Sequence, residues 1–419
     1  MEVKLTENEI LIAKKCIQLS KEYGAEKVRV TLSKSLMELF GMLDGELDKV
    51  THALDRSLSI VLFVDGKSGS FSTNRLLEDD LEEFISRAVT TVRMLAKDEC
   101  RDLPDPSREV KNAVEGNELG LYDMEYKTLS PEKRLQMAKS SSIWSRKAAM
   151  EKGFRIISEE GEYSDSVFDA VTMDSNGLYA RHCETSFEIG YEVTVEDPEG
   201  NRISAYWWDA SPTLKGILVP LSECSETAVK RAAAQINPSR HEGGLMNLVL
   251  DSECASKVVA PLLNALGGYS IQQKNSFLTG KKDIKVFGDN VPLIDRPHEK
   301  GKTGSRLYDS EGVATEDMPI IENGVVKNYF INTYMSGKLQ MEPTIEDCSR
   351  PVLSSVGNCK EAEDLLKKVG NGIYVTGFNG GNSNAATGDF SYGIEGFVFK
   401  NGKIVHPVRE MLMTGNFID

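Results

Sequence analysis

Histidine is scarce in this chain, and its cysteines are widely scattered. The 419 residues include five histidines and seven cysteines. Because no two histidines lie three, four or five residues apart, no single helix can present two imidazoles to one zinc ion. The odd number of cysteines, without paired spacings, also argues against a disulfide framework. A zinc site assembled from distant positions stays open.

Long apolar runs and clustered basic residues are missing as well. No stretch approaches the roughly 20 apolar residues that a transmembrane helix needs. The net charge is −15, and the one basic cluster, Lys281-Lys282 with Lys285, is small, which argues against direct nucleic-acid binding. The first residues lack the basic start and apolar block of a signal peptide. We therefore expect a cytoplasmic protein with no membrane partner.

Capping signals and apolar spacing predict several helices. The first opens with Thr6 and Glu9, which are spaced to form a capping box. Another opens with Ser130 as cap and Pro131 in the first helical position. Further helices are expected at residues 77–96, 227–235 and 252–266, the last with Ser252 as its cap and Pro261 in its middle.

Asn-Gly and Asp-Gly pairs between β-prone runs predict β-hairpins, because these pairs adopt the positive φ angles of tight turns. Turns are expected at Asp65-Gly66, Asn176-Gly177, Asn323-Gly324 and Asn401-Gly402. Antiparallel strands should therefore dominate. Helices interrupt them without regular alternation, which is typical of an α+β fold.

Two stretches rich in breakers, residues 100–120 and 209–216, divide the chain into three expected units. Residues 1–105 are expected to form a mixed N-terminal α+β domain of antiparallel hairpins and helices. Residues 106–215 should form a central antiparallel β-rich region. Residues 216–419 should form a C-terminal domain dominated by antiparallel β-sheet.

The C-terminal stretch from Gly372 to Asn416 contains a loop dense in glycine and asparagine. These residues allow the backbone to turn closely around itself or around a ligand. Such a loop either lines a site or is a long surface connection. Asp309, Glu311 and Asp389 would form a carboxylate group if the C-terminal sheets bring them together, although acids beside glycine are commonly turn formers.

Several motifs in the C-terminal half resemble those of one protein family. They are Gly304 to Asp309 with Glu311 to Thr315, Ile321 to Val325, Thr333-Tyr334, and Thr387 to Ser391 continuing through Gly415-Asn416. They resemble the TldD/PmbA family, named for a proposed modulation of DNA gyrase, and are most similar to its PmbA (TldE) branch. The resemblance covers nearly the whole chain and is most specific at the C-terminal end.

The resemblance implies membership of a family of intracellular metallopeptidases that cut peptides and unfolded polypeptides. Its active branch binds zinc through His-Glu-x-x-x-His on a helix and a cysteine near the end of the chain. The equivalent helix here, residues 254–266, has no His and no Glu, and the last cysteine is Cys359. The resemblance thus implies a subunit without catalytic or zinc-binding residues. Its partner would be a zinc-bearing TldD-like catalytic subunit or a second copy of itself.

A wall of antiparallel strands can accept an extended peptide as an added strand. The candidate residues that would line such a cleft are Asn379, Gly380, Gly381, Asn382, Thr387, Gly388, Asp389 and Ser391. Two alternatives stay open. One is a stand-alone hydrolase that uses Asp309, Asp389 or Ser383, and the other is a non-enzymatic peptide-binding or regulatory protein.

Overall fold

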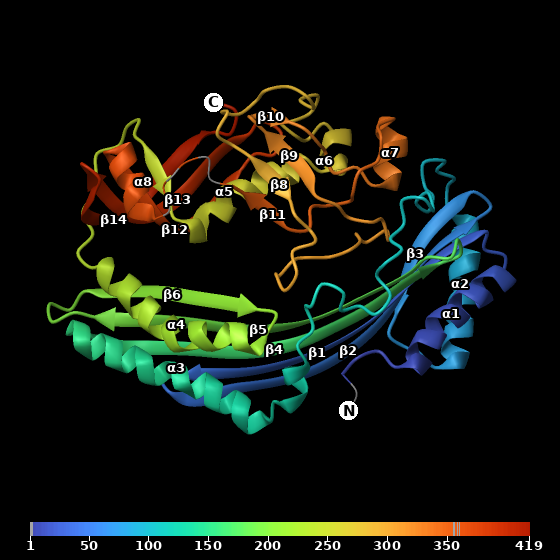
Figure 1. Ribbon diagram of the computed structural model, residues 1–419, viewed down its shortest axis with the longest axis horizontal. Helices are drawn as coiled ribbons and strands as arrows, with labels where there is room; N and C mark the ends of the chain where they lie inside the picture. The colour runs from blue at the N-terminus through green and yellow to red at the C-terminus, as the bar shows by residue number, and fades with distance from the viewer. Residues whose placement is uncertain (1–2, 355–356, 358, 360) are drawn as a thin grey trace.

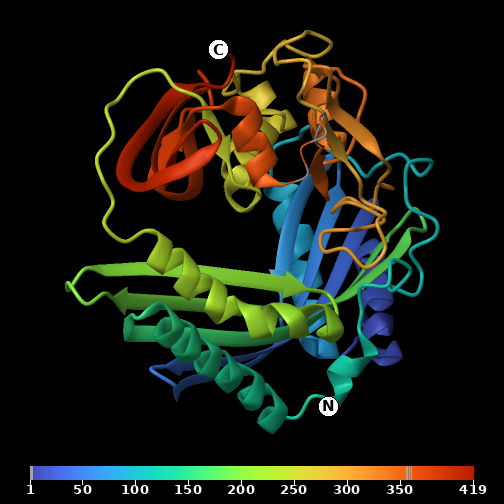
Figure 2. The same ribbon diagram turned by 60° about the vertical axis from the view of Figure 1, so that its left-hand side comes forward.

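The computed structural model describes residues 3–354, 357, 359 and 361–419. An N-terminal unit contains one long, curved sheet, and a C-terminal unit sits along one side of it (Figure 1). Figure 2 shows the connection as a long segment that rises from the end of one helix to the C-terminal unit. The fold is α+β, as the sequence predicts.

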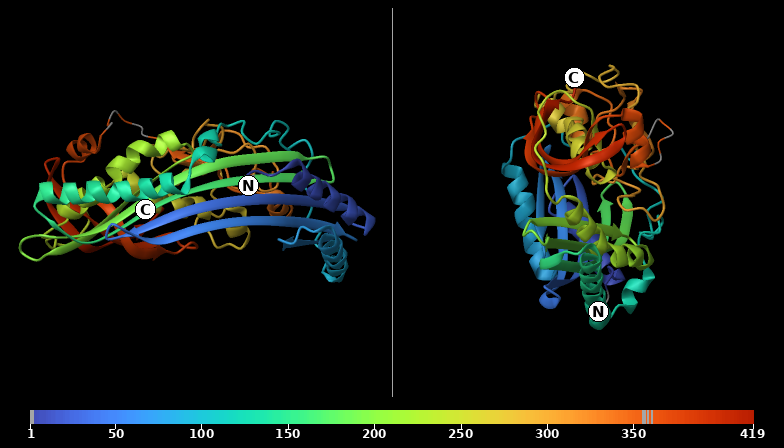
Figure 3. Two further views of the ribbon diagram at one scale, coloured as in Figure 1. Left: turned by 90° about the horizontal axis from the view of Figure 1, so that it is seen from below. Right: turned by 90° about the vertical axis from the view of Figure 1, so that its left-hand side faces the viewer.

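The N-terminal sheet has six antiparallel strands in the order β3-β2-β1-β4-β5-β6. Its strands are β1 (Lys27–Leu43), β2 (Glu46–Val64), β3 (Lys67–Thr73), β4 (Arg155–Asp174), β5 (Tyr179–Glu196) and β6 (Arg202–Ser211). Figure 3 shows that the long strands are bowed along their length. The predicted hairpin turns at Asp65-Gly66 and Asn176-Gly177 join β2 to β3 and β4 to β5, which confirms both.

Four helices cover one face of this sheet. They are α1 (Glu7–Glu22), α2 (Glu78–Met94), α3 (Pro131–Lys152) and α4 (Leu214–Ala234). The even-numbered residues of β1 explain the arrangement, because side chains alternate between the faces of a strand. Val28 to Leu32 contribute to the core under α1 and α2, whereas Leu36 to Met42 contribute to the core under α3 and α4. The odd-numbered residues point to the opposite face.

The helix caps follow the sequence signals in most places. The Thr6 amide donates to Glu9 Oε2 at 2.8 Å, and the Glu9 amide donates to Thr6 Oγ1 at 3.2 Å, so the predicted capping box forms. Ser130 caps α3 as expected. None of the described helices combines the length and the apolar character needed to cross a membrane.

The expected unit boundaries fall inside continuous structure. The boundary at residue 105 separates β3 from β4, yet both belong to one sheet, because β1 pairs with β2 on one side and with β4 on the other. Helix α4 begins at Leu214, whereas the sequence suggested residue 227, and it packs on β5 and β6 across the second boundary. Ile217 and Leu221 extend the helix, because both are buried in the core on this sheet and their partners become apparent only when the sheet has formed.

The C-terminal unit holds two four-stranded sheets, in the orders β10-β9-β8-β11 and β14-β13-β12-β7. The first contains β8 (Leu293–Asp295), β9 (Met318–Glu322), β10 (Val325–Val326) and β11 (Pro351–Leu353). The second contains β7 (Leu248–Leu250), β12 (Gly372–Ser383), β13 (Asp389–Lys400) and β14 (Lys403–Asn416). The helices are α5 (Ser252–Ala265), α6 (Gly268–Gln272), α7 (Thr333–Leu339) and α8 (Ala362–Val369).

Two local predictions in this unit need correction. Asp251, not Ser252, caps α5, and its side chain accepts from the Glu253 amide at 3.0 Å. The strand predicted after Asn323-Gly324 is only two residues long. The following residues, Tyr329 to Ile331, are buried in the core beside α6 and lead into α7. Burial of this apolar run outweighs its propensity to extend a hairpin.

Two carboxyl groups meet in a buried position where the segment after α2 crosses the end of β4. Glu109 and Asp174 are both buried, and Glu109 Oε1 and Asp174 Oδ2 accept no hydrogen bond from a described donor. The other Asp174 oxygen accepts from the amides of Asn176 and Leu178 at 2.8 and 2.9 Å. Burial, followed by hydrogen bonding with Asp174, raises the pKa of Glu109.

The free energy of unfolding is expected to fall as pH rises through the raised pKa of Glu109. Between the ordinary glutamate pKa of 4.5 and that raised pKa, the folded chain keeps a proton that the unfolded chain releases. Below this window Glu109 is protonated in both the folded and the unfolded chain. The full contribution of the protonated Glu109 to the free energy of unfolding is then present. Glu109→Gln places a permanent N–H donor opposite Asp174. In denaturant unfolding measured at several pH values, this variant should therefore show a weaker dependence of the free energy of unfolding on pH.

The matched control is Glu115→Gln, which replaces an exposed carboxyl group on the same segment. Its free energy of unfolding should change with pH as steeply as that of the unmodified chain. A Glu109→Gln variant with an unchanged slope would show that the buried pair does not hold the proton.

Candidate functional site

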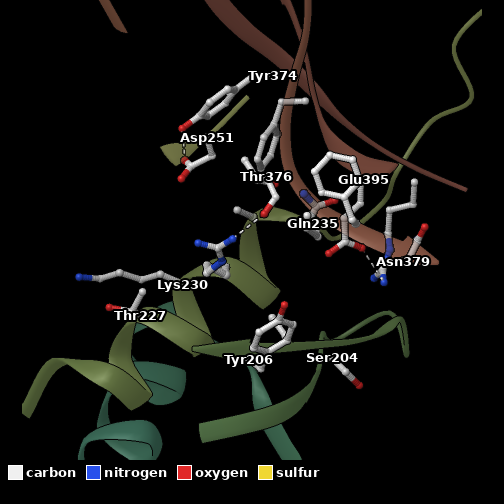
Figure 4. A pocket seen from close by; sticks show the side chains of 17 residues that line it. Ser204, Tyr206, Thr227, Lys230, Gln235, Asp251, Tyr374, Thr376, Asn379 and Glu395 are labelled. Atoms are coloured by element: carbon white, nitrogen blue, oxygen red, sulfur yellow. Dashed lines mark hydrogen bonds and ion pairs between the residues drawn. The ribbon is translucent and has the colours of Figure 1, made fainter. Parts of the chain in front are cut away.

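A cavity of about 430 Å³ lies between the two units (Figure 4). One wall comes from edge strand β6 and the C-terminal half of α4, and the other comes from β12, β13 and β14. The residues that line it are Ser204, Ala205, Tyr206, Thr227, Lys230, Arg231, Ala234, Gln235, Asp251, Tyr374, Thr376, Gly377, Phe378, Asn379, Glu395, Phe397 and Arg409. Clefts between units are common places for ligand binding.

An acidic corner of the cavity forms where α5 begins. The Tyr374 hydroxyl donates to the Asp251 carboxylate, as the dashed line in Figure 4 marks. Burial, followed by this hydrogen bond, raises the pKa of Tyr374 well above its usual value. Burial, followed by the charge of Asp251, also raises the pKa of Glu253 on the first turn of α5. The surroundings of Asp251 therefore favour the neutral forms of both the Tyr374 hydroxyl and the Glu253 carboxyl group.

One arginine ties the two walls together, and a second forms an ion pair within one wall. Arg231 of α4 donates from Nη2 to the Thr376 carbonyl oxygen at 2.6 Å, and its guanidinium carbon lies 4.9 Å from the centroid of the Trp207 ring. Arg409 of β14 pairs with Glu395 of β13 at 3.1 Å. Because Arg231 bridges from the N-terminal unit to β12, it fixes the position of that strand against the cavity.

Strand β12 leaves one of its edges open beside the cavity. Strand β7 pairs with it only from Ile373 to Val375. From Gly377 to Ser383, β12 pairs with β13 alone among the described strands, and residues 379–382 are exposed. An unpaired strand edge presents a row of amide and carbonyl groups that can pair with another chain. The cavity thus opens onto an unpaired strand edge.

The glycine-rich stretch, expected as a loop, is in fact a bulged strand. Irregular pairing occurs between Phe378 and Gly381, and Gly380 and Gly381 have φ angles of 104° and 97°. A Cβ atom on Gly381 would lie 2.2 Å from the Ser391 carbonyl oxygen, whereas a Cβ atom on Gly380 would meet nothing within 4 Å. Glycine thus lets β12 bend while it stays paired with β13.

The predicted lining residues lie along one hairpin, but only Asn379 lines the cavity. Gly380, Gly381 and Asn382 follow it along β12. Thr387 to Ser391 lie at the far end of the hairpin, where Thr387 Oγ1 donates to Asp389 Oδ2 at 2.6 Å and Asn416 Nδ2 donates to Asp389 Oδ1 at 2.8 Å. The hydrogen bond from Thr387, followed by the one from Asn416, lowers the pKa of Asp389. These contacts close the end of the hairpin.

Of the three residues of the alternative hydrolase site, Ser383 pairs with Phe390 next to Asp389 on the hairpin of β12 and β13, whereas Asp309 has a separate set of contacts. Asp309 is buried and accepts from the amides of Glu311, Val313 and Glu346 at 2.9, 3.0 and 3.0 Å. Asp389 instead contacts Thr387 and Asn416. Asp309 therefore forms a turn, and Asp389 closes the end of the hairpin with Thr387 and Asn416.

Several cavity residues were not found from the sequence, namely Arg231, Tyr374, Glu395 and Arg409. They come from four elements, and no local spacing links them. Asp251 was missed too, although a local signal exists, because an aspartate directly before an apolar helix is a cap signal; Ser252 was predicted as the cap instead.

The start of α5 does not supply a zinc site. It offers Glu253 and Cys254, but no imidazole. The Cys254 thiol donates to the carbonyl oxygens of Asp251 and Val375 at 3.3 Å each, and burial raises its pKa to about 11, which opposes the thiolate that zinc needs. Within the described residues, no three His, Cys, Asp or Glu side chains are grouped to hold a metal ion.

Comparison with known proteins defines the class of this chain as a metallopeptidase-type protein. Residues 243–419 match the PmbA/TldA metallopeptidase C-terminal domain, and residues 28–91 match the PmbA/TldA metallopeptidase domain 1. The chain belongs to the PmbA/TldD family of metallopeptidases, which confirms the resemblance seen in its motifs.

Relatives with similar length support this assignment. The chain is 27% identical to the metalloprotease PmbA homologue of Buchnera aphidicola, with 99% of this chain and 91% of that protein aligned. A proposed modulator of DNA gyrase from Bacteroides thetaiotaomicron has a crystal structure with a TM-score of 0.91 and 36% identity, covering 99% of this chain and 92% of that chain. TldE from Thermococcus kodakarensis shares the fold, with a TM-score of 0.80 at 18% identity over 97% and 91% of the two chains.

Proposed function

We propose that this chain is a PmbA/TldE-like subunit of a TldD/TldE-type metallopeptidase. It binds an extended peptide beside β12 and leaves the zinc ion to a TldD-like catalytic partner. The observation that carries the proposal is the open edge of β12 from Gly377 to Ser383, next to the cavity between the units. Backbone pairing along such an edge does not depend on sequence, which suits peptides and unfolded polypeptides as substrates.

The cavity supports the same role through its side chains. Phe378, Phe397 and Tyr206 supply apolar surface, whereas Asp251 and Glu395 supply charge. An extended peptide places alternate side chains on opposite faces, so one set can enter the cavity while the backbone pairs with β12. Backbone pairing with β12 would then provide affinity, and the side chains that enter the cavity would provide selectivity.

The donor set at α5 supports a non-catalytic role. Zinc peptidases activate a water molecule at a site with three protein ligands. Here Glu253 and the buried Cys254 thiol are the nearest candidates, and no imidazole accompanies them on the helix. The partner subunit, or in its absence a second copy of this chain, would complete the assembly. The seven cysteines are all free, which suits a reducing compartment such as the cytoplasm.

A reconstitution experiment tests the proposal. The purified chain, a TldD-like relative that carries the zinc ligands, and their mixture are each incubated with a fluorescently labelled unstructured peptide. We expect the chain alone to bind the peptide without cleaving it, and the mixture to cleave it faster than the relative alone. A chelator should abolish cleavage without abolishing binding by this chain.

Peptides with N-methylated amides test the mode of binding. N-methyl groups at alternate residues in one phase should abolish binding, because they remove the donors that face β12, and the same groups in the other phase should have little effect. Stoichiometric zinc in the purified chain, or cleavage by the chain alone that resists chelation, would contradict the silent-subunit role. Binding without any gain in the mixture would favour a regulatory peptide-binding protein.

A further inference from the structure

A second cavity, of about 350 Å³, lies on the face of the six-stranded sheet that the helices leave open. Arg29 of β1 pairs with Val61 of β2, and Val61 pairs with Ser70 of β3. Phe63 and Ser68 form the neighbouring pair. Because directly paired residues share one face of a sheet, these side chains form the floor of the cavity.

The opposite wall comes from outside the sheet. It includes Arg101, Asp102, Glu311 and Tyr334. Arg29 Nη1 donates to the Glu311 carbonyl oxygen at 3.0 Å. The Arg101 guanidinium carbon lies 3.9 Å from the centroid of the Tyr334 ring. Two guanidinium groups are thus held in place, one by a carbonyl group and the other by an aromatic ring.

Neither arginine forms an ion pair with an acid in the described part of the chain, although Arg29 interacts electrostatically with the Glu311 carboxylate. Nearby lysines differ, because Lys27 pairs with Asp102 at 2.5 Å and Lys338 pairs with Asp98 at 3.0 Å. A guanidinium carries five N–H donors, and the described hydrogen bonds use one on Arg29 and none on Arg101. The remaining N–H donors are available to a ligand, and the Asp102 and Glu311 carboxylates line the same cavity.

The remaining polar groups of the cavity leave room for an acceptor. The Ser68 and Ser70 hydroxyls form no hydrogen bond with a described residue. The Glu311 carboxylate also lines the cavity, but its Oε2 atom accepts from the amide and the hydroxyl of Thr333 at 2.9 and 2.8 Å. Val61 and Phe63 add apolar surface for the body of a ligand.

We propose that this cavity binds the oxyanion group of a small ligand, a carboxylate or a phosphate, between the guanidinium groups of Arg29 and Arg101. The planar fork of an arginine matches the two oxygens of such a group. The cavity shares no lining residue with the peptide cavity at β12, so oxyanion binding and peptide binding can be measured separately.

Calorimetric titration of the full chain at constant ionic strength tests this site. The probes are inorganic phosphate, an N-acetylated tripeptide with a free C-terminal carboxylate, and the same tripeptide as its amide. We expect saturable binding of phosphate or of the free acid, and weaker binding of the amide, which lacks the carboxylate and retains only the backbone groups that could pair with β12. Binding of phosphate alone identifies a phosphate site, and binding of the free acid alone identifies a carboxylate site.

Arginine variants connect the binding to these residues. Arg29→Gln and Arg101→Gln should each weaken binding by about tenfold or more, because each removes charged hydrogen bonds. Arg87→Gln is the control, since Arg87 is exposed on α2 and pairs with Glu83, and it should bind like the unmodified chain. An equal loss in all three variants would overturn the site, as would the absence of saturable binding to either oxyanion.

Chemical labelling provides a test that needs no variant. Phenylglyoxal modifies accessible arginines, and the bound oxyanion should slow the modification of Arg101 relative to that of Arg87, as mass spectrometry would measure. Equal modification of Arg101 with and without saturating phosphate and free-acid tripeptide would contradict the proposal.

Discussion

Arg134→Ala is expected to lower the free energy of unfolding of the N-terminal unit by about 3–5 kcal/mol, because it leaves a buried carboxylate without its partner. Arg134 of α3 donates from Nε and Nη2 to the two oxygens of Asp165 on β4 at 2.6 and 3.0 Å. The side chains are 6% and 0% exposed. The same guanidinium donates from Nη1 to the Leu129 carbonyl oxygen at 2.7 Å, so one side chain holds both the start of α3 and the sheet.

Tryptophan fluorescence measures this effect locally. The three tryptophans are Trp144 on α3 and Trp207 and Trp208 on β6, so denaturant unfolding followed by their emission reports on the N-terminal unit. The control is Arg155→Ala, which removes an ion pair to Glu196 from an arginine side chain that is 70% exposed. Exposed pairs contribute at most about 1 kcal/mol. Equal losses for Arg134→Ala and Arg155→Ala would contradict the role given to burial.

Gly381→Ala is expected to abolish most peptide binding by the chain, and Gly380→Ala is expected to keep it. Both glycines have φ angles that alanine adopts only with strain, which costs about 1–3 kcal/mol at either position. Only at Gly381 would the new Cβ atom meet backbone, since it would lie 2.2 Å from the Ser391 carbonyl oxygen and 2.6 Å from Tyr392 Cα. Such overpacking costs about 1–3 kcal/mol more and displaces β12 from β13.

Comparison of the two glycine variants separates the effect of backbone strain, which both share, from the effect of displacing β12 from β13, which is expected only for Gly381→Ala. Fluorescence anisotropy with the labelled peptide should give at least a tenfold weaker affinity for Gly381→Ala than for Gly380→Ala, which corresponds to about 1.4 kcal/mol. Unfolding curves of both variants show whether the C-terminal unit remains folded. If a folded Gly381→Ala variant binds as tightly as Gly380→Ala, the bulged edge of β12 is not the peptide site.

Local signals in the sequence predicted local structure well. The capping box at Thr6 and Glu9 and the hairpin turns at Asp65-Gly66 and Asn401-Gly402 depend on residues within a few positions of one another. The same holds for the Ser130 cap of α3. Such elements are fixed by short-range hydrogen bonds and by the φ angles that each residue permits.

Long-range pairing was the part that the sequence did not reveal. Strands β2 (Glu46–Val64) and β4 (Arg155–Asp174) flank β1 in one sheet, although β3, α2, a long irregular segment and α3 separate them in the chain. The early start of α4 and the short β10 have the same origin, because in each case burial against distant residues decides how far an element extends.

By itself, the sequence determined the family, the α+β class, the hairpin turns and the lack of His on α5, since each depends on which residues are present and how they are spaced. Only the tertiary structure decided that β7 pairs with just three residues of β12. It also decided that Arg231 and Asp251 lie in the cavity beside the part of β12 that β7 leaves unpaired. It likewise placed Arg29 and Arg101 around one cavity, although the positions are 72 residues apart in the chain (101 − 29). Residues far apart in sequence become neighbours only when sheets and units pack, and packing depends on the burial of apolar surface across the whole chain.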